Sequence, residues 1–150
     1  MTMKLRLAAA LGAAALAGLV ASGAYAAEHE VRMLNRGAAG AMVFEPQIVR
    51  AAPGDTIRFV ATDKGHNAET IKGMVPEGAE PFAGKLNEEI AVTLDTEGVY
   101  GVRCKPHYGL GMVMLIQVGE PVNAEAAKAA KSPKKAKARF DTLFAELEGK

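Results

Sequence analysis

The stretch Cys104-Lys105-Pro106-His107-Tyr108-Gly109-Leu110-Gly111-Met112 places a thiol, an imidazole and a thioether within nine residues. All three are soft or borderline metal ligands, and Cys104 is the only cysteine of the chain. The segments before and after the stretch, 98–103 and 113–118, have the composition of β-strands. The candidate ligands therefore lie on a tight loop at one end of a predicted sheet.

The types of ligand favour copper. A thiolate and neutral imidazoles suit copper or zinc, whereas two histidines and one cysteine with a weak axial methionine are typical of a blue-copper electron-transfer site. Outside the stretch the chain offers only His29 and His66 as a second histidine, and His66 follows an apolar strand predicted over 57–61. The predicted ligands are His66, Cys104, His107 and Met112.

His66-Asn67 and the pattern Cys104-x-x-His107-x-x-x-x-Met112 together resemble the cupredoxins, and within them the pseudoazurin group, which are small blue-copper electron carriers of bacterial periplasms. The resemblance extends over residues 27–150. It is carried by segments 33–35, 40–46, 53–55, 64–67, 76–78 and 105–108. Leu110 departs from the pattern, because pseudoazurins often have a methionine there; the difference concerns the partner-facing surface and not the ligand at Met112.

This resemblance implies a Greek-key β-sandwich that holds one copper ion, cycles it between Cu(II) and Cu(I), and turns over no substrate. It also implies periplasmic redox partners, with a copper nitrite reductase or another denitrification enzyme as acceptor and a cytochrome as donor. In the family, the asparagine that matches Asn67 braces the ligand loops, and its backbone amide hydrogen-bonds to the cysteine sulfur. The position that matches Met42 lies near the exposed histidine ring.

The spacing of strands and turns predicts an all-β fold in its own right. Several short strands separated by turn signals indicate a β-sandwich or barrel. The predicted strands are 29–35, 48–50, 56–61, 90–94, 98–103 and 113–118. Between them, segment 69–87 loses periodicity and is rich in glycine and proline, which predicts mostly loop.

Two short helices are predicted at the C-terminus. Asn123 is the predicted cap of the first, and Ser132 caps the second with Pro133 in its first turn. One apolar stripe at helical spacing is expected to pack on an outer face of the sandwich: Ala136, Phe140, Leu143, Phe144 and Leu147. The lysines between 128 and 137, Lys135 among them, predict a solvated helix face remote from the copper end.

The first 26 residues have the features of a cleavable signal peptide: basic Lys4 and Arg6, an apolar run over 7–20, and the small-x-small site Ala24-Tyr25-Ala26. The predicted division is a signal peptide at 1–26, a copper-binding domain at 27–121 and a helical extension at 122–150. Without Lys4 and Arg6 the 18 basic residues become 16, against 17 acidic ones. This balance does not indicate nucleic-acid binding, and we expect a periplasmic monomer without membrane insertion after cleavage.

Two other classes of function compete with electron transfer. Cys104 could be a nucleophile with His107 as its base, but an enzyme of this kind leaves His66 and Met112 without a role. A copper store or chaperone would favour exposed, easily exchanged ligands, whereas these are split between a turn and a loop between two strands. Met114 points the same way as Met112 along its strand and is the alternative axial ligand, although Met112 lies nearer the loop.

Overall fold

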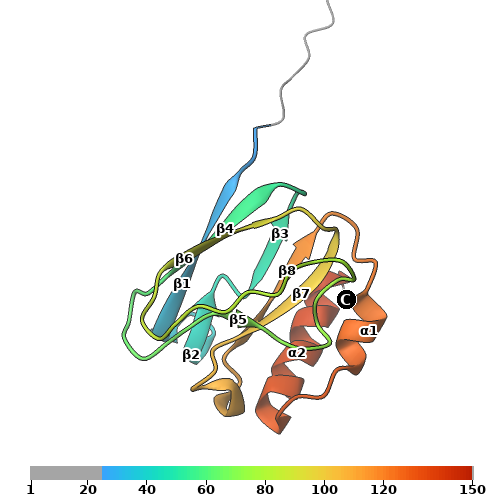
Figure 1. The fold of residues 1–150 in the computed structure, drawn as a ribbon. Coiled ribbons are helices and arrows are strands. Elements are labelled where there is room, and N and C mark those ends of the chain that lie inside the picture. Colours follow the sequence, from blue (N-terminus) through green and yellow to red (C-terminus); the bar gives the residue numbers. More distant parts are fainter. Residues whose placement is uncertain (1–24, 150) are drawn as a thin grey trace, which may run out of the picture.

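The computed structural model describes residues 25–149 as two four-stranded sheets packed face to face, with two helices on the outer side of one sheet (Figure 1). The first sheet has the order β2 (Gly40–Glu45), β1 (Glu28–Gly37), β4 (Asp55–Val60) and β6 (Ile90–Leu94). The second has the order β3 (Ile48–Ala51), β8 (Val113–Val118), β7 (Gly98–Arg103) and β5 (Glu69–Thr70). The predicted all-β sandwich is confirmed, while the predicted signal peptide lies, up to residue 24, outside the described residues.

The strand pairing is mixed. β1 pairs with β4 in parallel, and β3 pairs with β8 in parallel, whereas the other neighbours are antiparallel. The chain changes sheets between β2 and β3, where Pro46 falls. A proline cannot donate to a ladder, so it suits this crossing between the sheets.

β7 and β8 are buried on both faces, which explains their nearly continuous apolar sequence. One face of these strands packs against the first sheet in a core that includes Phe44, Phe59 and Tyr100. The opposite face packs against the helices. Because both sides of these strands are enclosed, the loop that joins them is anchored at both ends in the buried part of the sandwich.

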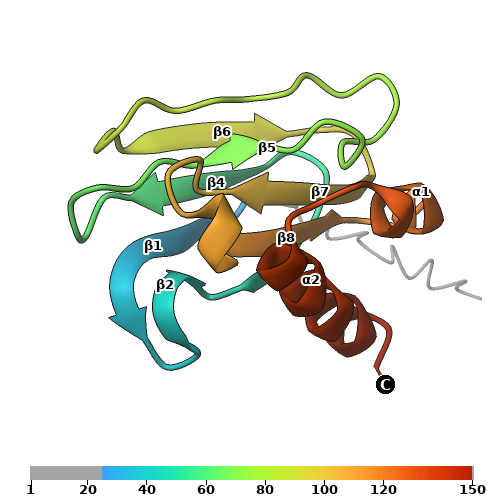
Figure 2. The ribbon, with the colours of Figure 1, turned by 90° about the horizontal axis from the view of Figure 1, so that it is seen from below.

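The helices α1 (Ala124–Ala129) and α2 (Lys134–Leu147) cover the outer face of β7 and β8 (Figure 2). The predicted stripe of α2 is confirmed, since its residues from Ala136 to Phe144 are buried in this second cluster and Leu147 packs against it. Within residues 25–149, no helix has the length and apolar character needed to cross a membrane.

Of the two predicted helix caps, Asn123 does occupy the N-cap position of α1, but without a capping side-chain bond, and Ser132 is not the cap of α2. The Asn123 side chain does not cap α1; instead its Oδ1 accepts from the Val99 amide at 2.6 Å and its Nδ2 donates to the Val99 carbonyl at 2.9 Å. These two bonds pin the chain to β7 just before α1 begins. At α2, Pro133 occupies the cap position and the helix begins at Lys134. Ser132 is thus one residue too early to cap this helix.

α2 runs from the end of the sandwich that carries residue 104 towards the opposite end. Near its start, the Lys135 carbonyl lies 3.2 Å from the position that a Cβ on Gly111 would take. Near its finish, the Leu147 carbonyl accepts from Arg50 at 3.3 Å. Lys135 is therefore not remote from the candidate ligands, contrary to the expectation from sequence, and Arg50 marks the distant end.

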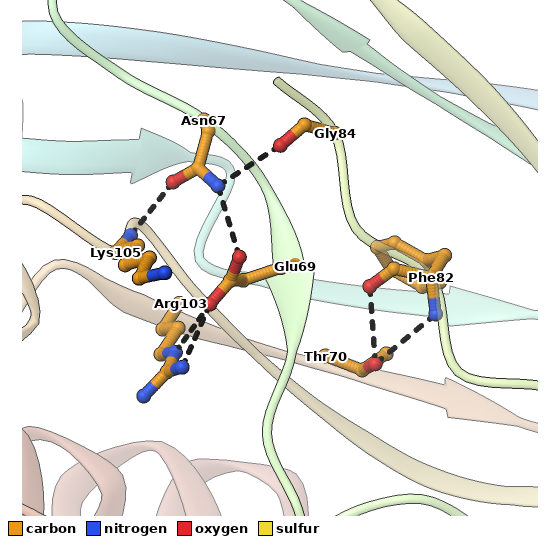
Figure 3. Close-up of polar contacts among 7 residues, drawn as sticks. All are labelled: Asn67, Glu69, Thr70, Phe82, Gly84, Arg103 and Lys105. Carbon is orange, nitrogen blue, oxygen red and sulfur yellow. Dashed lines mark hydrogen bonds and ion pairs between the residues drawn. The ribbon is translucent and has the colours of Figure 1, made fainter. Parts of the chain in front are cut away.

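The predicted loop over 69–87 contains a short strand that the sequence did not indicate. β5 pairs with β7 on one side, and on the other side Thr70 exchanges hydrogen bonds with Phe82 through its backbone amide and its hydroxyl (Figure 3). β5 thus joins the irregular segment to the edge of the second sheet. It also fixes the residues that directly follow His66.

Asp55 joins the start of β1 to the start of β4. Its carboxylate accepts from the Ala27 amide at 2.8 Å and the Ala52 amide at 2.9 Å, and it contacts His29 Nε2 at 2.8 Å. These contacts lower the pKa of Asp55 from 3.8 to about 2, with the bond to His29 as the largest cause and the bonds to the two amides next. A lowered carboxyl pKa stabilises the folded state above the unfolded pKa, and this contribution is lost as the pH falls through the folded pKa.

We therefore expect Asp55→Asn to lower the denaturant midpoint of the copper-free protein at pH 7. The difference from wild type should shrink as the pH falls from about 4 towards about 2, because protonation then removes the same charge from the wild-type protein. Denaturant titrations over this range test the prediction, with Asp141→Asn on the exposed face of α2 as control. A midpoint difference that stayed constant down to pH 2 would contradict it.

Candidate metal centre

Two loop connections, β7–β8 and β4–β5, bring the predicted ligands together. Cys104 follows β7 directly, His107 and Met112 flank the 3-10 turn η1 (Tyr108–Leu110), and His66 lies between β4 and β5. Within the β7–β8 connection, the Cys104 amide donates to the Met112 carbonyl at 3.0 Å, and the Met112 amide donates to the His107 carbonyl at 3.1 Å. The loop therefore closes on itself and holds its three candidate ligands at fixed spacing.

Gly111 makes this closure sterically possible. Its φ of 88° lies in the left-handed region, which glycine adopts without the steric cost that a Cβ brings. A Cβ at this position would also meet the Lys135 backbone of α2 at 3.2 Å. The spacing between His107 and Met112 thus depends on a glycine at this turn.

The ligand atoms of the histidines and the cysteine form a small triangle. His66 Nδ1 lies 3.1 Å from His107 Nδ1, and Cys104 Sγ lies 3.7 Å from the first nitrogen and 3.5 Å from the second. Metal ions in proteins lie about 2.0–2.3 Å from nitrogen and sulfur ligands, so ligands that share one ion are roughly 3–4 Å apart. The three side chains fit a single metal ion.

The candidate ligands differ in their access to solvent. His66, Cys104 and Met112 are each 0% exposed, whereas His107 is only half-buried. Met112 and Met114 both belong to the core between the sheets. Among the four candidate ligands, His107 is the one whose ring reaches the surface.

Asn35, at the end of β1, fixes the orientation of His66. Its Oδ1 lies 2.8 Å from His66 Nε2, so this nitrogen carries the proton and Nδ1 presents a lone pair towards Cys104 and His107. Burial, followed by the proximity of His107, lowers the pKa of His66 and keeps its imidazole neutral. Asn35 was not predicted as a site residue, because nothing in its local pattern reveals a partner 31 residues away.

The surroundings of the Cys104 thiol oppose its ionisation. Burial raises its pKa, while backbone N–H groups of Asn67 and His107 directed at the sulfur act in the opposite direction. A metal ion held by Cys104 would supply positive charge and favour the thiolate over the thiol. The amide of Asn67 thus makes the contact to the cysteine sulfur that the family resemblance implies.

The Asn67 side chain joins the two ligand loops. Its Oδ1 accepts from the Lys105 amide at 2.7 Å and its Nδ2 donates to the Gly84 carbonyl at 3.1 Å (Figure 3). On the other side of His66, Asn87 Oδ1 accepts from the Gly65 amide at 2.6 Å. The His66 segment is therefore held from both sides, which limits how far it can move when metal binds or leaves.

The other residues considered from sequence lie as follows. His29 pairs with Asp55, at the end of β1 opposite to Asn35 and His66, so it stays a structural residue. Met42 is half-buried, has a φ of 52° and packs against the core between the sheets.

Comparisons with known proteins agree with this geometry. Residues 31–119 match the family of copper binding proteins described as plastocyanin/azurin. A pseudoazurin of Paracoccus pantotrophus is 58% identical over 139 residues, which cover 92% of this chain and 95% of that one. A Sinorhizobium pseudoazurin structure superposes with a TM-score of 0.80 at 55% identity, covering 81% of this chain and 97% of the other. The pseudoazurin structure from Methylobacterium extorquens AM1 gives a TM-score of 0.77 at 50% identity, with coverage of 80% and 98%.

Proposed function

The chain belongs to the plastocyanin/azurin family of copper-binding proteins, in its pseudoazurin group, and on this premise we propose that His66, Cys104, His107 and Met112 hold its copper ion. Proteins of this group are type 1 copper electron carriers and not enzymes. The observation that supports the ligand set most strongly is the triangle of His66 Nδ1, His107 Nδ1 and Cys104 Sγ, with sides of 3.1, 3.5 and 3.7 Å.

Each ligand has a distinct task in this proposal. Bound copper supplies a one-electron couple, Cu(II)/Cu(I), whose potential depends on the axial ligand and on the surroundings of the thiolate. Cys104 provides the thiolate, His66 the buried imidazole and Met112 the weak axial sulfur. Because hydrogen bonds hold the ligand loops at this spacing in the protein alone, a change of oxidation state needs little rearrangement.

His107 is the proposed exit and entry point of the electron, because its ring is the ligand that reaches the surface. Exposed apolar side chains lie near it: Pro106 and Leu110 belong to the same loop, and Leu86 lines a groove together with Pro106; Leu86 is 57% exposed and Leu110 is 50% exposed. A partner that covers this patch would bring its own redox centre close to the His107 ring. Leu110 would then form part of the contact.

We propose that the acceptor is an acidic periplasmic enzyme such as a copper nitrite reductase, and that a cytochrome is the donor. The residues from Ala27 to Pro121 include more acidic than basic side chains, yet the exposed Lys64 and Lys105 each lie within two residues of a ligand. Complementary charges of this kind steer encounter and raise the association rate more than they raise affinity.

Electron transfer to such a reductase should therefore slow as the salt concentration rises, since exposed charges are screened beyond roughly 8–10 Å at physiological ionic strength. At low salt we expect Lys64→Glu and Lys105→Glu each to lower the bimolecular rate constant about tenfold, by removing part of the steering. Stopped-flow reduction of a copper nitrite reductase by the Cu(I) protein measures this directly.

The matched control is Arg50→Glu, which makes the same change of charge at the opposite end of the sandwich, where α2 finishes. Lys135 is unsuitable as a control, because it lies beside Gly111 at the copper end. The proposal that partners dock at the copper end would be wrong if Arg50→Glu slowed transfer as much as the two loop variants, or if the rate did not depend on salt.

We also propose a periplasmic location, with cleavage after Ala26 and a monomeric carrier made of the copper-binding domain 27–121 and the helical extension 122–150. In support, Ala27 makes backbone hydrogen bonds to the sandwich: its amide donates to Asp55 at 2.8 Å, and its carbonyl accepts from the Thr56 amide at 2.9 Å. Cleavage at this bond would place a charged α-amino group beside the Asp55 carboxylate.

A further inference from the structure

Glu69 forms an ion pair with Arg103 and also contacts Asn67 of the candidate metal centre. The copper chemistry does not itself require this ion pair. It is the first residue of β5 and lies directly opposite Arg103 of β7 in the strand register. Its Oε1 accepts from Arg103 Nε at 2.8 Å and Nη2 at 2.7 Å, and its Oε2 accepts from Asn67 Nδ2 at 3.2 Å (Figure 3). The Glu69 carboxylate therefore accepts hydrogen bonds from two residues, Arg103 on one side and Asn67 on the other.

This arrangement is more enclosed than an ordinary surface ion pair. The Glu69 side chain is 13% exposed, whereas the carboxylates that surround Arg58 on the other sheet are 51–55% exposed. Exposed pairs contribute little, but breaking a partly buried pair leaves a charge without compensation. Arg103 is held in addition by its contact with the Tyr108 ring, whose centroid lies 4.9 Å from the guanidinium carbon.

The bond from Asn67 to Glu69 is one of two contacts that set which way the Asn67 amide faces. With Nδ2 directed at Glu69 and Gly84, Oδ1 is left to accept from the Lys105 amide, next to Cys104. If the amide turned over, its NH2 group would face the Lys105 N–H and two donors would meet. The orientation of Asn67 is thus fixed jointly by the Gly84 carbonyl and by the side-chain acceptor that Glu69 provides.

We infer that Glu69 is a positioning residue of the copper site: neutralised by Arg103, its carboxylate orients the Asn67 amide that clamps the Cys104 loop at Lys105. This inference rests on the proposed ligand set. It makes β5 a functional part of the site and not only an edge strand. It also gives the Glu69–Arg103 pair a role in setting the reduction potential, because both charges lie close to Cys104.

Glu69→Gln tests the inference, because glutamine keeps the shape but offers only one acceptor oxygen for donors on two sides. In the copper-free protein we expect hydrogen exchange of the Lys105 amide to become at least about tenfold faster, as its acceptor loosens. In the copper-loaded variant the uncompensated Arg103 should favour Cu(I). At a fixed applied potential the Cu(II)/Cu(I) ratio should fall at least about threefold. A tenfold change in this ratio corresponds to about 59 mV for a one-electron couple.

Arg103→Gln provides the opposite charge change and a second decisive measurement should Glu69→Gln fail to fold. It leaves the Glu69 carboxylate uncompensated, so the Cu(II)/Cu(I) ratio at the same applied potential should rise. The matched control is Glu28→Gln, which removes a carboxylate that accepts from Arg58 at 2.8 Å on the exposed face of the first sheet. Neither the Lys105 exchange rate nor the potential should change in this control.

The inference is overturned if Glu69→Gln leaves both the Lys105 exchange rate and the potential at their wild-type values. It is also overturned if Glu69→Gln and Arg103→Gln shift the potential in the same direction, or if Glu28→Gln has an equal effect. These outcomes differ from a failure of the ligand assignment, because the exchange measurement needs no metal and the assignment is tested by substitution of the ligands themselves.

Discussion

Replacement of Cys104 by serine is expected to abolish the intense visible absorption of the oxidised, copper-loaded protein. That absorption arises from charge transfer between a thiolate and Cu(II), and Cys104 is the only cysteine in the chain. A serine hydroxyl is a far poorer ligand for soft metals than a thiolate. Absorption spectra of wild-type and variant proteins after addition of one equivalent of Cu(II) provide the measurement, with loss of essentially the whole band as the expected result.

His29→Asn is the matched control, since it removes a histidine that lies at the opposite end of β1 beside Asp55. This variant should keep the full intensity of the band. Retention of an intense blue band by Cys104→Ser would show that the ligand assignment is wrong. So would stoichiometric zinc in the native protein after copper had been freely available.

The parts of the fold that follow from local sequence were predicted well. β7 and β8 are continuous apolar segments because the first sheet covers one face and the helices cover the other. The stripe of α2 has helical spacing because one side of this helix packs on those strands. His66, Cys104 and His107 were predicted as ligands from residue type and spacing, and the structure brings their ligand atoms within 3.7 Å of one another.

The site residues that were not predicted from sequence make their contacts with distant segments of the chain. Asn35 and His66 are 31 residues apart, and Glu69 and Arg103 are 34 apart. Neither pair has a local pattern that would identify it, because these polar residues become neighbours only through the strand order of the sheets. Asn123 occupies the N-cap position as predicted, but its side chain bonds to the peptide group of Val99, 24 residues away, and not to the first turn of α1.

Substitution of Met112 by glutamine is expected to lower the reduction potential while largely retaining the fold. An amide oxygen stabilises Cu(II) relative to Cu(I) more than a thioether does, so the oxidised state is favoured and the reduction potential falls. We expect a decrease of at least about 59 mV, which corresponds to a tenfold change in the Cu(II)/Cu(I) ratio for a one-electron couple. Because residue 112 is fully buried, the polar amide should also cost about 1–3 kcal/mol of unfolding free energy.

Voltammetry of Met112→Gln and of Met114→Leu separates the two methionines that follow the loop. Both side chains are 0% exposed and both belong to the core between the sheets, so burial alone does not distinguish an axial ligand from a core residue. The backbone does: the Met112 amide and carbonyl bond to His107 and Cys104, whereas Met114 pairs with Val102 further along β8. Met114→Leu nearly conserves volume and should leave the potential unchanged. If Met114→Leu shifted the potential and Met112→Gln did not, Met114 would be the axial sulfur, and the closed loop between His107 and Met112 would serve only to shape the site.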